Sequence, residues 1–524
     1  METLKSYVCG GWHEASAGFR ELVDPSTGEP VARASSAGVD FGAVLAHARD
    51  RGGPGLRELT FAQRSGLLKE MSRALRDRRD ELLELSRINT GTTARDGAFD
   101  VDGATGTLAY YAAAGKRLGD RRLLPEDDGA QLSRSEAFWG RHLLVPRRGA
   151  AVAINAFNFP AWGFAEKAAC ALLAGMPVVV KPATATAWVA HRCVELVVEA
   201  GILPEGALQM ICGDTGDLLD RLGPQDVLAF TGSADTAAGL RDRENLRRAN
   251  TRINVEADSL NAAVLAPGVE GAAWDLFLKD VVREMTQKSG QKCTAVRRIL
   301  APAGDAGRVE EALAERLAEV VTGNPAEASV TMGPLATAQQ LRDAVAGVAE
   351  LRRAARLVHG TGERSDGAGS PPGTGFFFPP TLLRAEDGGG ASAVHEREVF
   401  GPVATVVPYD GAAASAAGVV ALGGGTLVTS VYGDDPEWLG SFVEAVGGYT
   451  GRVYVGSEAA AGEAPGSGIA LPQSLHGGPG RAGGGEELGG LVGVKLYLQR
   501  VAVQGARPLV EELSAEPETS EPLK

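Results

Sequence analysis

The spacing of apolar positions changes along the chain, and each spacing predicts a different element. Between residues 61 and 90, apolar side chains recur every three or four positions among charged ones, which is typical of helices that face a core. A second helical pattern covers residues 103–116. Residues 5–35 instead combine short apolar stretches with turn-forming residues, which predicts short strands joined by turns.

From residue 149 to 230, short continuous apolar runs alternate with helical stretches. The pattern predicts buried strands at 149–154, 177–181, 207–211 and 226–230, and helices at 162–174 and 187–200. Such alternation predicts a parallel, doubly wound α/β sheet. Because ligands of these sheets bind at the carboxyl ends of strands, Lys181 and the turn at residues 231–233 are candidate ligand contacts.

Other stretches depart from this pattern. A second series of strands and helices runs from about residue 262 to 409 and predicts a second domain. Residues 120–147 are more polar and predict an extended excursion from the core, whereas residues 360–375 and 459–490 form glycine-rich loops. The acidic, proline-containing segment after Arg507 is predicted to be mobile.

Composition excludes several classes of protein. The chain has 524 residues, enough for more than one domain, and its net charge of −14 argues against nucleic acid as its main partner. No apolar run is long enough to span a membrane, and the first residues lack the apolar core of a signal peptide. The five cysteines form no CxxC pair, and the seven histidines are scattered. We therefore expect a soluble cytoplasmic protein without a metal site.

Three polar residues are candidates for covalent chemistry on a carbonyl. Cys293 lies in the polar, glycine-containing stretch 287–294, Glu256 closes the run 253–256, and Asn158 precedes a proline by two positions. A thiol can attack a carbonyl, an acid can move protons, and an amide can stabilise an oxyanion. Taken singly, each also has an ordinary explanation as a buried cysteine, a paired carboxylate or a turn residue.

Two glycine-containing stretches are candidates for phosphate binding. Residues 230–233 (Phe-Thr-Gly-Ser) follow an apolar strand and precede a candidate helix, whose exposed N–H groups would favour a phosphate. Residues 478–483 fit the GxGxxG pattern, but we expect no strand before them and assign them no dinucleotide role.

The order of these features along the chain resembles the aldehyde dehydrogenase family. Asn158, Lys181, the turn at 230–233, Glu256, Cys293 and the run 398–402 (Glu-Val-Phe-Gly-Pro) match the family at its usual spacing, and the resemblance covers nearly the whole chain. It implies an α/β fold with a Rossmann-like coenzyme domain (1–127 and 148–257) and an α/β catalytic domain (258–490). It further implies a small oligomerisation arm (128–147 and 491–507), followed by the tail (508–524).

The resemblance also implies catalytic roles for four residues. Cys293 would attack the aldehyde, and Asn158 with the Cys293 N–H would hold the oxyanion. Glu256 would activate the water that hydrolyses the thioester, and Lys167 could assist proton transfer. The family uses its arm to join subunits, so we expect a homodimer, with a tetramer of two dimers as the alternative.

The coenzyme contacts implied by the resemblance are Lys181 on the adenosine ribose, Gly232 and Ser233 on the pyrophosphate, and Glu398 and Phe400 on the nicotinamide ribose and ring. Thr184 stands where members that prefer NAD often carry a glutamate. Because a carboxylate there would repel a 2′-phosphate and a threonine does not, we predict NADP as the coenzyme, with NAD as the alternative.

Two stretches resemble a narrower branch of the family. Residues 255–261 and 471–491 are similar to those of dehydrogenases that act on CoA-linked semialdehydes in phenylacetate and benzoyl-CoA degradation. We therefore expect a CoA-linked semialdehyde as substrate, with 3,4-dehydroadipyl-CoA semialdehyde as the leading candidate. The alternatives are a free semialdehyde such as succinic semialdehyde, transfer of the acyl group to CoA, and an inactive scaffold. His476 could face the substrate channel or simply hold its glycine-rich loop.

Overall fold

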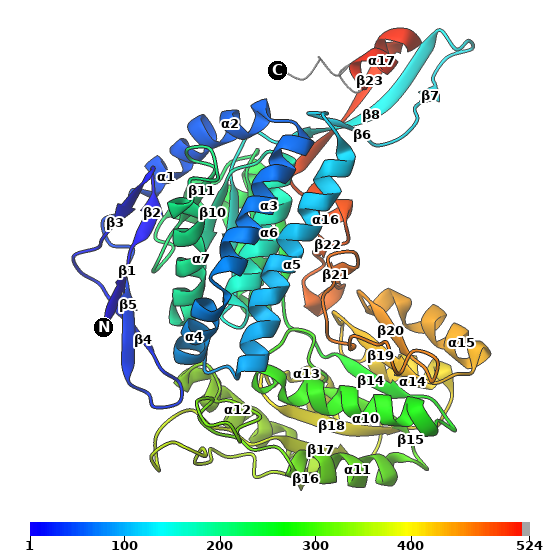
Figure 1. The fold of residues 1–524 in the computed structure, drawn as a ribbon. Helices are drawn as coiled ribbons and strands as arrows, with labels where there is room; N and C mark the ends of the chain where they lie inside the picture. Colours follow the sequence, from blue (N-terminus) through cyan, green and yellow to red (C-terminus); the bar gives the residue numbers. More distant parts are fainter. Residues whose placement is uncertain (516–524) are drawn as a thin grey trace.

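The computed structural model describes residues 1–515 and has two seven-stranded sheets side by side (Figure 1). In the first sheet the strand order is β13-β12-β9-β10-β11-β2-β3. Its strands are β2 (Ser6–Val8), β3 (Gly11–His13), β9 (Ala151–Ile154), β10 (Val178–Lys181), β11 (Leu208–Met210), β12 (Val227–Thr231) and β13 (Arg252–Glu256). Strands β9 to β13 are parallel, as the alternating pattern predicted.

Both faces of this sheet are buried, which explains its continuous apolar runs. Successive side chains of a strand point to opposite faces, so Val178 and Val180 pack in one core and Val179 in another. Helices α3 (Phe61–Asp77), α5 (Ala94–Leu118), α6 (Pro160–Ala174) and α7 (Ala187–Glu199) contribute to the first core. Helices α1 (Phe41–His47), α8 (Ala234–Asp242) and α9 (Glu244–Ala249) contribute to the second.

Two predicted helices differ in extent from the observed ones. The pattern at 61–90 is divided at Arg78, whose φ of −117° ends α3 before α4 (Arg79–Thr90) begins. The helix predicted at 103–116 starts earlier, at Ala94, because Thr93 caps its first turn. Four glycines within α5 interrupt the apolar periodicity of its sequence. One of them, Gly103, leaves room for the Trp162 ring, which an added Cβ would approach to 2.2 Å.

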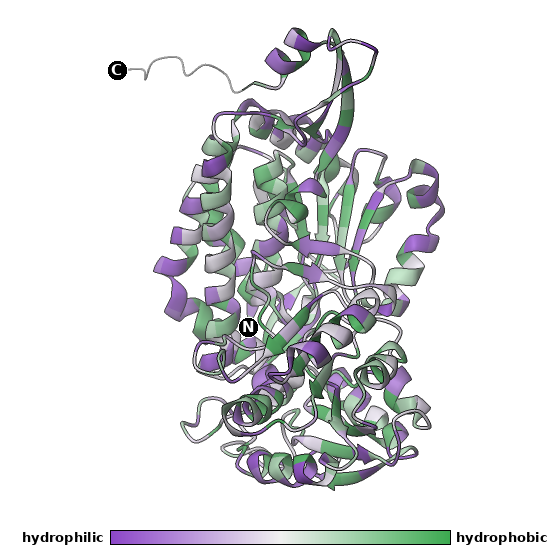
Figure 2. Ribbon diagram, turned by 90° about the vertical axis from the view of Figure 1, so that its right-hand side faces the viewer, coloured by the Kyte–Doolittle hydropathy of each residue, from purple (hydrophilic) through white to green (hydrophobic). Residues whose placement is uncertain are grey.

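The second sheet has the strand order β16-β17-β18-β15-β14-β19-β20 and extends beyond the predicted limit at residue 409. Its strands are β14 (Ala262–Leu265), β15 (Arg298–Pro302), β16 (Ala355–His359), β17 (Thr381–Ala385), β18 (Val403–Tyr409), β19 (Thr429–Tyr432) and β20 (Val453–Gly456). Its helices include α10 (Gly271–Thr286), α11 (Ala306–Ala318), α12 (Ala338–Leu351), α14 (Ala413–Ala421) and α15 (Pro436–Val446). The strands of both sheets are mostly hydrophobic (green), and hydrophilic residues (purple) gather on the outer helices (Figure 2).

A small sheet projects from the body of the molecule (Figure 1). Strand β8 (Phe138–Pro146) pairs antiparallel with β23 (Leu498–Ala506), which joins the two segments of the predicted arm, and β6 (Leu124–Pro125) and β7 (Ala130–Gln131) also pair with β8. Strand β23 is an edge strand, and Leu132, Phe138 and Val501 of this arm are exposed. These features support a subunit interface, but the homodimer and the domain boundaries stay predictions that a mass measurement in solution and limited proteolysis can test.

The segment after Arg507 corrects one prediction. Residues Arg507–Leu513 form helix α17 instead of a mobile tail. Pro508 occupies its first turn, Val510 is buried, and Arg507 pairs with Glu511 one turn later. The rest of the predicted tail, from residue 516 onward, lies outside the described residues. Over residues 1–515, no helix is both long and apolar enough to cross a bilayer.

Candidate active site

The thiol of Cys293 is placed by an unusual turn at the end of α10. Lys288, Ser289 and Gly290 all have positive φ, at 52°, 56° and 67°. Gly290 cannot carry a side chain, because a Cβ would lie 2.2 Å from the Gly401 carbonyl oxygen. The Ser289 hydroxyl donates to the Gly333 carbonyl at 2.7 Å and so stabilises a conformation that side chains disfavour.

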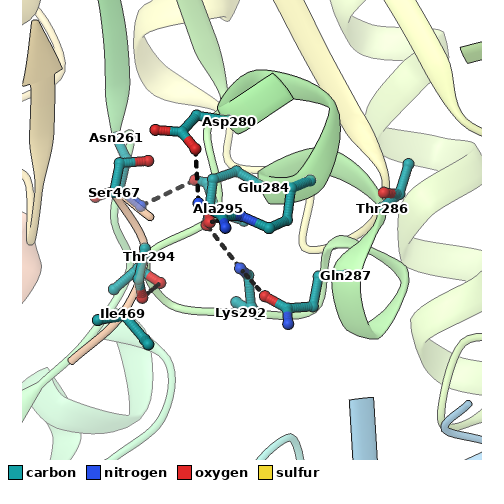
Figure 3. Close-up of polar contacts among 12 residues, drawn as sticks. Asn261, Asp280, Glu284, Thr286, Gln287, Lys292, Thr294, Ala295, Ser467 and Ile469 are labelled. Atoms are coloured by element: carbon teal, nitrogen blue, oxygen red, sulfur yellow. Dashed lines mark hydrogen bonds and ion pairs between the residues drawn. The ribbon is translucent and has the colours of Figure 1, made fainter. Parts of the chain in front are cut away.

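A buried polar cluster anchors the residues on either side of Cys293 (Figure 3). The Lys292 ammonium lies 2.7 Å from a Glu284 oxygen and donates to Gln287 at 2.8 Å. The Asn261 amide donates to the carbonyls of Cys293 and Ala295 at 2.7 and 3.0 Å. The sequence did not indicate the anchoring roles of Glu284 and Asn261, because the turn after α10 brings Glu284 back to Lys292 and only the folded chain brings Asn261 to the thiol loop.

A cavity beside the thiol is lined by all the predicted catalytic residues and by His476. Cys293, Glu256, Asn158, Lys167 and His476 all line it. Its apolar wall includes Phe99, Phe159 and Trp162. The Asn158 amide donates one hydrogen to the Gln291 carbonyl at 3.0 Å, which fixes it against the thiol loop and leaves its second hydrogen for a ligand.

His476 lies between the thiol and the carboxylate. Its Nε2 atom is 3.7 Å from the Cys293 sulfur and 3.1 Å from a Glu256 oxygen, and the imidazole is 4 % exposed. It belongs to the short hairpin of β21 (Leu475–Gly477) and β22 (Glu486–Leu488), in which it faces Glu487. Of the two interpretations of this residue, the structure supports a place at the cavity, although its role stays a prediction.

The three groups shift each other's proton affinities. Burial and the negative charge of Glu256 raise the pKa of the Cys293 thiol well above its usual value. Burial also raises the pKa of Glu256, but the charge and hydrogen bonding of His476 and the charge of Lys167 outweigh it and hold that pKa at about 2. Burial lowers the pKa of His476, yet the Glu256 charge outweighs burial and the net shift is upward.

A second buried ion cluster lies behind Glu256. The Lys167 ammonium donates to Glu166 at 2.9 Å and to Glu487 at 3.2 Å, and Asn254 donates to the other Glu487 oxygen at 3.2 Å. Burial lowers the pKa of Lys167, but its two carboxylate partners raise it well above the usual value. Burial raises the pKa of Glu166 to about 7. The sequence indicated Lys167 but neither acidic partner. Glu487 is 320 residues away, and adjacency alone did not show that Glu166 pairs with Lys167.

The predicted coenzyme residues lie at the carboxyl edge of the first sheet. Lys181 ends β10, and Gly232 and Ser233 connect β12 to α8, with Ser233 as the N-cap of that helix. Thr231, just before them, has a buried hydroxyl oxygen without a hydrogen-bond partner in the described chain, as expected where a polar ligand can bind. Glu398 and Phe400 lie in the segment that precedes β18 of the second sheet.

Several contacts at this edge were not indicated by the sequence. Asp258 accepts a hydrogen bond from the Ala234 N–H at 3.0 Å, so a carboxylate already occupies part of the α8 N-terminus where Ser233 was expected to meet the pyrophosphate. Glu398 pairs with Arg297 at 3.3 Å and accepts from the Ser259 N–H at 3.0 Å. The Phe400 ring lies 5.3 Å from the Arg297 guanidinium.

The hydrogen bond of Thr184 and the charges near Lys181 are relevant to the choice between NAD and NADP. Its hydroxyl donates to the Gly213 carbonyl at 3.2 Å, so it fixes the local backbone. Burial lowers the pKa of Lys181, while the charges of Asp214 and Arg20 act in opposite directions on it. Arg20 pairs with Asp214 at 3.1 Å, which places a second cation near Lys181.

The GxGxxG stretch at 478–483 needs one correction. A strand does precede it, since β21 ends at Gly477. That strand pairs only with β22 in an antiparallel hairpin, and a single 3₁₀ turn at Gly480–Ala482 follows it. The strand–turn–helix unit of a dinucleotide site is therefore absent within residues 475–488.

A cysteine thiol, an asparagine amide and a buried glutamate lie together in one cavity, in the combination expected for the aldehyde dehydrogenase class. A family model described as the aldehyde dehydrogenase family matches residues 12–499, and the chain belongs to this family of oxidoreductases. It is 46 % identical over 478 residues, 91 % of this chain and 93 % of the relative, to 3,4-dehydroadipyl-CoA semialdehyde dehydrogenase of Aromatoleum evansii. It is 26 % identical to the NADP succinate-semialdehyde dehydrogenase of Escherichia coli, covering 77 % of this chain and 80 % of that protein.

Solved structures share the fold. The lactaldehyde dehydrogenase of Escherichia coli superposes with a TM-score of 0.82 at 22 % identity, covering 96 % of this chain and 99 % of that one. Betaine aldehyde dehydrogenase of Staphylococcus aureus, solved in complex with NAD+, gives a TM-score of 0.82 at 22 % identity, covering 99 % and 97 %. The predicted α/β aldehyde dehydrogenase fold is therefore confirmed.

Proposed function

We propose that this protein oxidises a CoA-linked semialdehyde to the carboxylic acid with reduction of NADP, and that its substrate is 3,4-dehydroadipyl-CoA semialdehyde. The relative from Aromatoleum evansii, which covers nearly the whole chain and bears that substrate in its name, is the observation that carries the proposal. The cavity with Cys293, Glu256 and Asn158 supplies the groups that the chemistry requires.

Each step follows from the groups that face the cavity. The Cys293 sulfur attacks the aldehyde carbon, and the free N–H of the Asn158 side chain stabilises the negative oxygen of the adduct. Loss of hydride leaves a thioester on Cys293, and NADP, when bound, supplies the hydride acceptor. Glu256 then accepts a proton from the attacking water, and the acid is released. Lys167, paired with Glu166 and Glu487, keeps a positive charge beside Glu256 throughout.

The charges in the cavity favour a thioester substrate over a free carboxylate. Among its described lining residues, the cationic side chains are Lys167, which is paired with two carboxylates, and His476, which is paired with Glu256. Neither is available to clamp a substrate carboxylate, and Glu166 and Glu256 would repel one. The aromatic wall suits an aliphatic chain instead. Free semialdehydes and a semialdehyde of phenylacetate degradation are the alternatives.

Substrate class is tested by comparing kcat/KM for 3,4-dehydroadipyl-CoA semialdehyde with that for the matching free semialdehyde, following NADPH formation. We expect the CoA-linked substrate to be preferred by roughly tenfold or more, which corresponds to about 1.4 kcal/mol of additional binding in the transition state. Equal or faster turnover of the free aldehyde would remove the CoA assignment and leave the dehydrogenase chemistry intact. A saturated CoA-linked semialdehyde serves as the control for chain recognition.

Coenzyme choice is tested at Thr184, which begins the 3₁₀ turn Thr184–Thr186 three residues after Lys181. Wild-type protein is expected to show a higher kcat/KM with NADP than with NAD. Thr184→Glu would place a carboxylate near the 2′-phosphate and is expected to lower kcat/KM for NADP by roughly tenfold, with a smaller change for NAD. Thr184→Gln, of similar size but neutral, is the matched control. A wild-type preference for NAD would contradict the assignment.

A further inference from the structure

The position of His476 gives the reaction a group that the proposed function does not yet use. Its Nε2 atom is within the reach of a hydrogen bond to sulfur, 3.7 Å from Cys293 Sγ, and is 3.1 Å from Glu256. The Cys293 thiol, half-buried beside a carboxylate, has a raised pKa and would stay protonated at neutral pH without a cation beside it. A base that becomes positively charged next to the sulfur would remove this difficulty.

We propose that His476 is the proton acceptor that activates Cys293, so that the sulfur, the imidazole and the Glu256 carboxylate act as one catalytic unit. The S–H bond breaks, its proton moves to Nε2, and a thiolate remains beside an imidazolium. Glu256 stabilises that imidazolium through the contact at 3.1 Å. When the thioester is hydrolysed, the sulfur leaves as a thiolate, the proton returns to it from Nε2, and the water proton passes through Glu256 to solvent.

The charges around the unit act on both the thiol and the imidazole. Glu256 on β13 and Glu166 on α6 both raise the affinity of His476 for a proton, and Arg452, which precedes β20, opposes them. On the thiol side, Lys292 lowers the Cys293 pKa while Glu256 and Glu166 raise it. Lys167 lies between Glu166 and Glu487 and screens their charge. Both carboxylates thus raise the proton affinity of the thiol and of the imidazole, and the transfer depends on an imidazolium that lies 3.7 Å from the sulfur and 3.1 Å from Glu256.

The hairpin that carries His476 explains why the residue holds its place. His476 and Glu487 are opposite each other in the register of β21 and β22. An added Cβ at Gly477 would lie 2.0 Å from the Gly485 carbonyl oxygen, and the φ of Gly477 is 145°. The glycines beside His476 thus permit a close backbone approach that presents the imidazole to the sulfur.

The test measures the reactivity of the thiol without any aldehyde, so its outcome does not depend on the substrate assignment, although the inference rests on the proposed role of Cys293. Iodoacetamide alkylation of the full-length protein is followed from pH 5 to 10 by mass spectrometry of the Cys293 peptide. EDTA is included because Glu256, Cys293 and His476 offer ligand atoms within 4.8 Å of one another and could take up a stray metal ion.

His476→Asn and His476→Phe are expected to alkylate at Cys293 about tenfold more slowly than wild type at pH 7, with a midpoint about one pH unit higher. Leu475→Ala, in the same strand but without a polar group, is the matched control and is expected to behave as wild type. Thermal melting confirms that each variant is folded. The first turnover of NADPH should slow in parallel with alkylation.

A purely structural role for His476 gives a different result. Asparagine can still form hydrogen bonds in the hairpin, so a loop-holding histidine predicts a wild-type rate and midpoint for His476→Asn. That outcome would overturn the proposal, as would loss of reactivity in Leu475→Ala to the same extent. Should His476→Phe fail to fold, His476→Asn alone still decides between the two roles.

Discussion

Cys293→Ala is expected to reduce kcat for aldehyde oxidation by roughly four orders of magnitude or more. The sulfur is the only atom lost, and the covalent thioester cannot form without it. Because Cys293 is only partly buried and its loop is anchored by Lys292 and Asn261, the fold and coenzyme binding are expected to be retained. NADPH formation measures the first effect, and thermal melting with coenzyme titration measures the second.

The matched control for this variant is Cys9→Ser, which changes an exposed thiol far from the cavity. It is expected to keep wild-type activity and to remain sensitive to iodoacetamide. Persistence of aldehyde oxidation in Cys293→Ala above the background rate would show that the reaction does not pass through this thiol, and the proposed mechanism would have to be abandoned.

Glu256→Gln is expected to stop the cycle after the first hydride transfer. The amide keeps the shape of the side chain but cannot accept the proton of the attacking water, so the thioester on Cys293 should accumulate. Rapid mixing is expected to show a burst of one NADPH per active site, followed by a steady-state rate reduced by roughly 10²- to 10⁴-fold. Intact-protein mass spectrometry should detect the acylated enzyme.

Hydroxylamine provides the control for this experiment, because it attacks a thioester without a general base and should restore turnover. Free CoA provides a second comparison: faster turnover with CoA than with water in the wild type would favour acyl transfer to CoA over hydrolysis. Because Glu256 also lies 3.1 Å from His476, the burst is expected to be slower than in wild type. A burst without accumulation of the acylated enzyme would show that the assignment of Glu256 to hydrolysis is wrong.

The two acid–base residues are coupled. A carboxylate whose pKa is held at about 2 is a weak base, and the cause is the neighbouring imidazole and Lys167. Once His476 returns its proton to the leaving sulfur, the imidazole is neutral and its effect on Glu256 falls. The hydrolysis step and the recovery of the thiol should therefore respond together to changes at either residue.

Motif spacing and local periodicity were enough to predict much of this protein. The strands at 149–154 and 226–230 could be predicted because a sheet buried on both faces requires continuous apolar runs. Cys293, Glu256 and Asn158 could be assigned together because their order and spacing match a known family, whose fold the structure confirms.

Only the tertiary structure brought the remaining groups together. His476 is 183 residues from Cys293, and Glu487 is 320 residues from Lys167, so no local period connects them. The carboxylate of Asp258 at the start of α8 and the hydrogen bond of Asn261 to the Cys293 carbonyl likewise depend on how separate segments pack. Their proton affinities depend on burial and on the distances between charges, and both are properties of the folded chain.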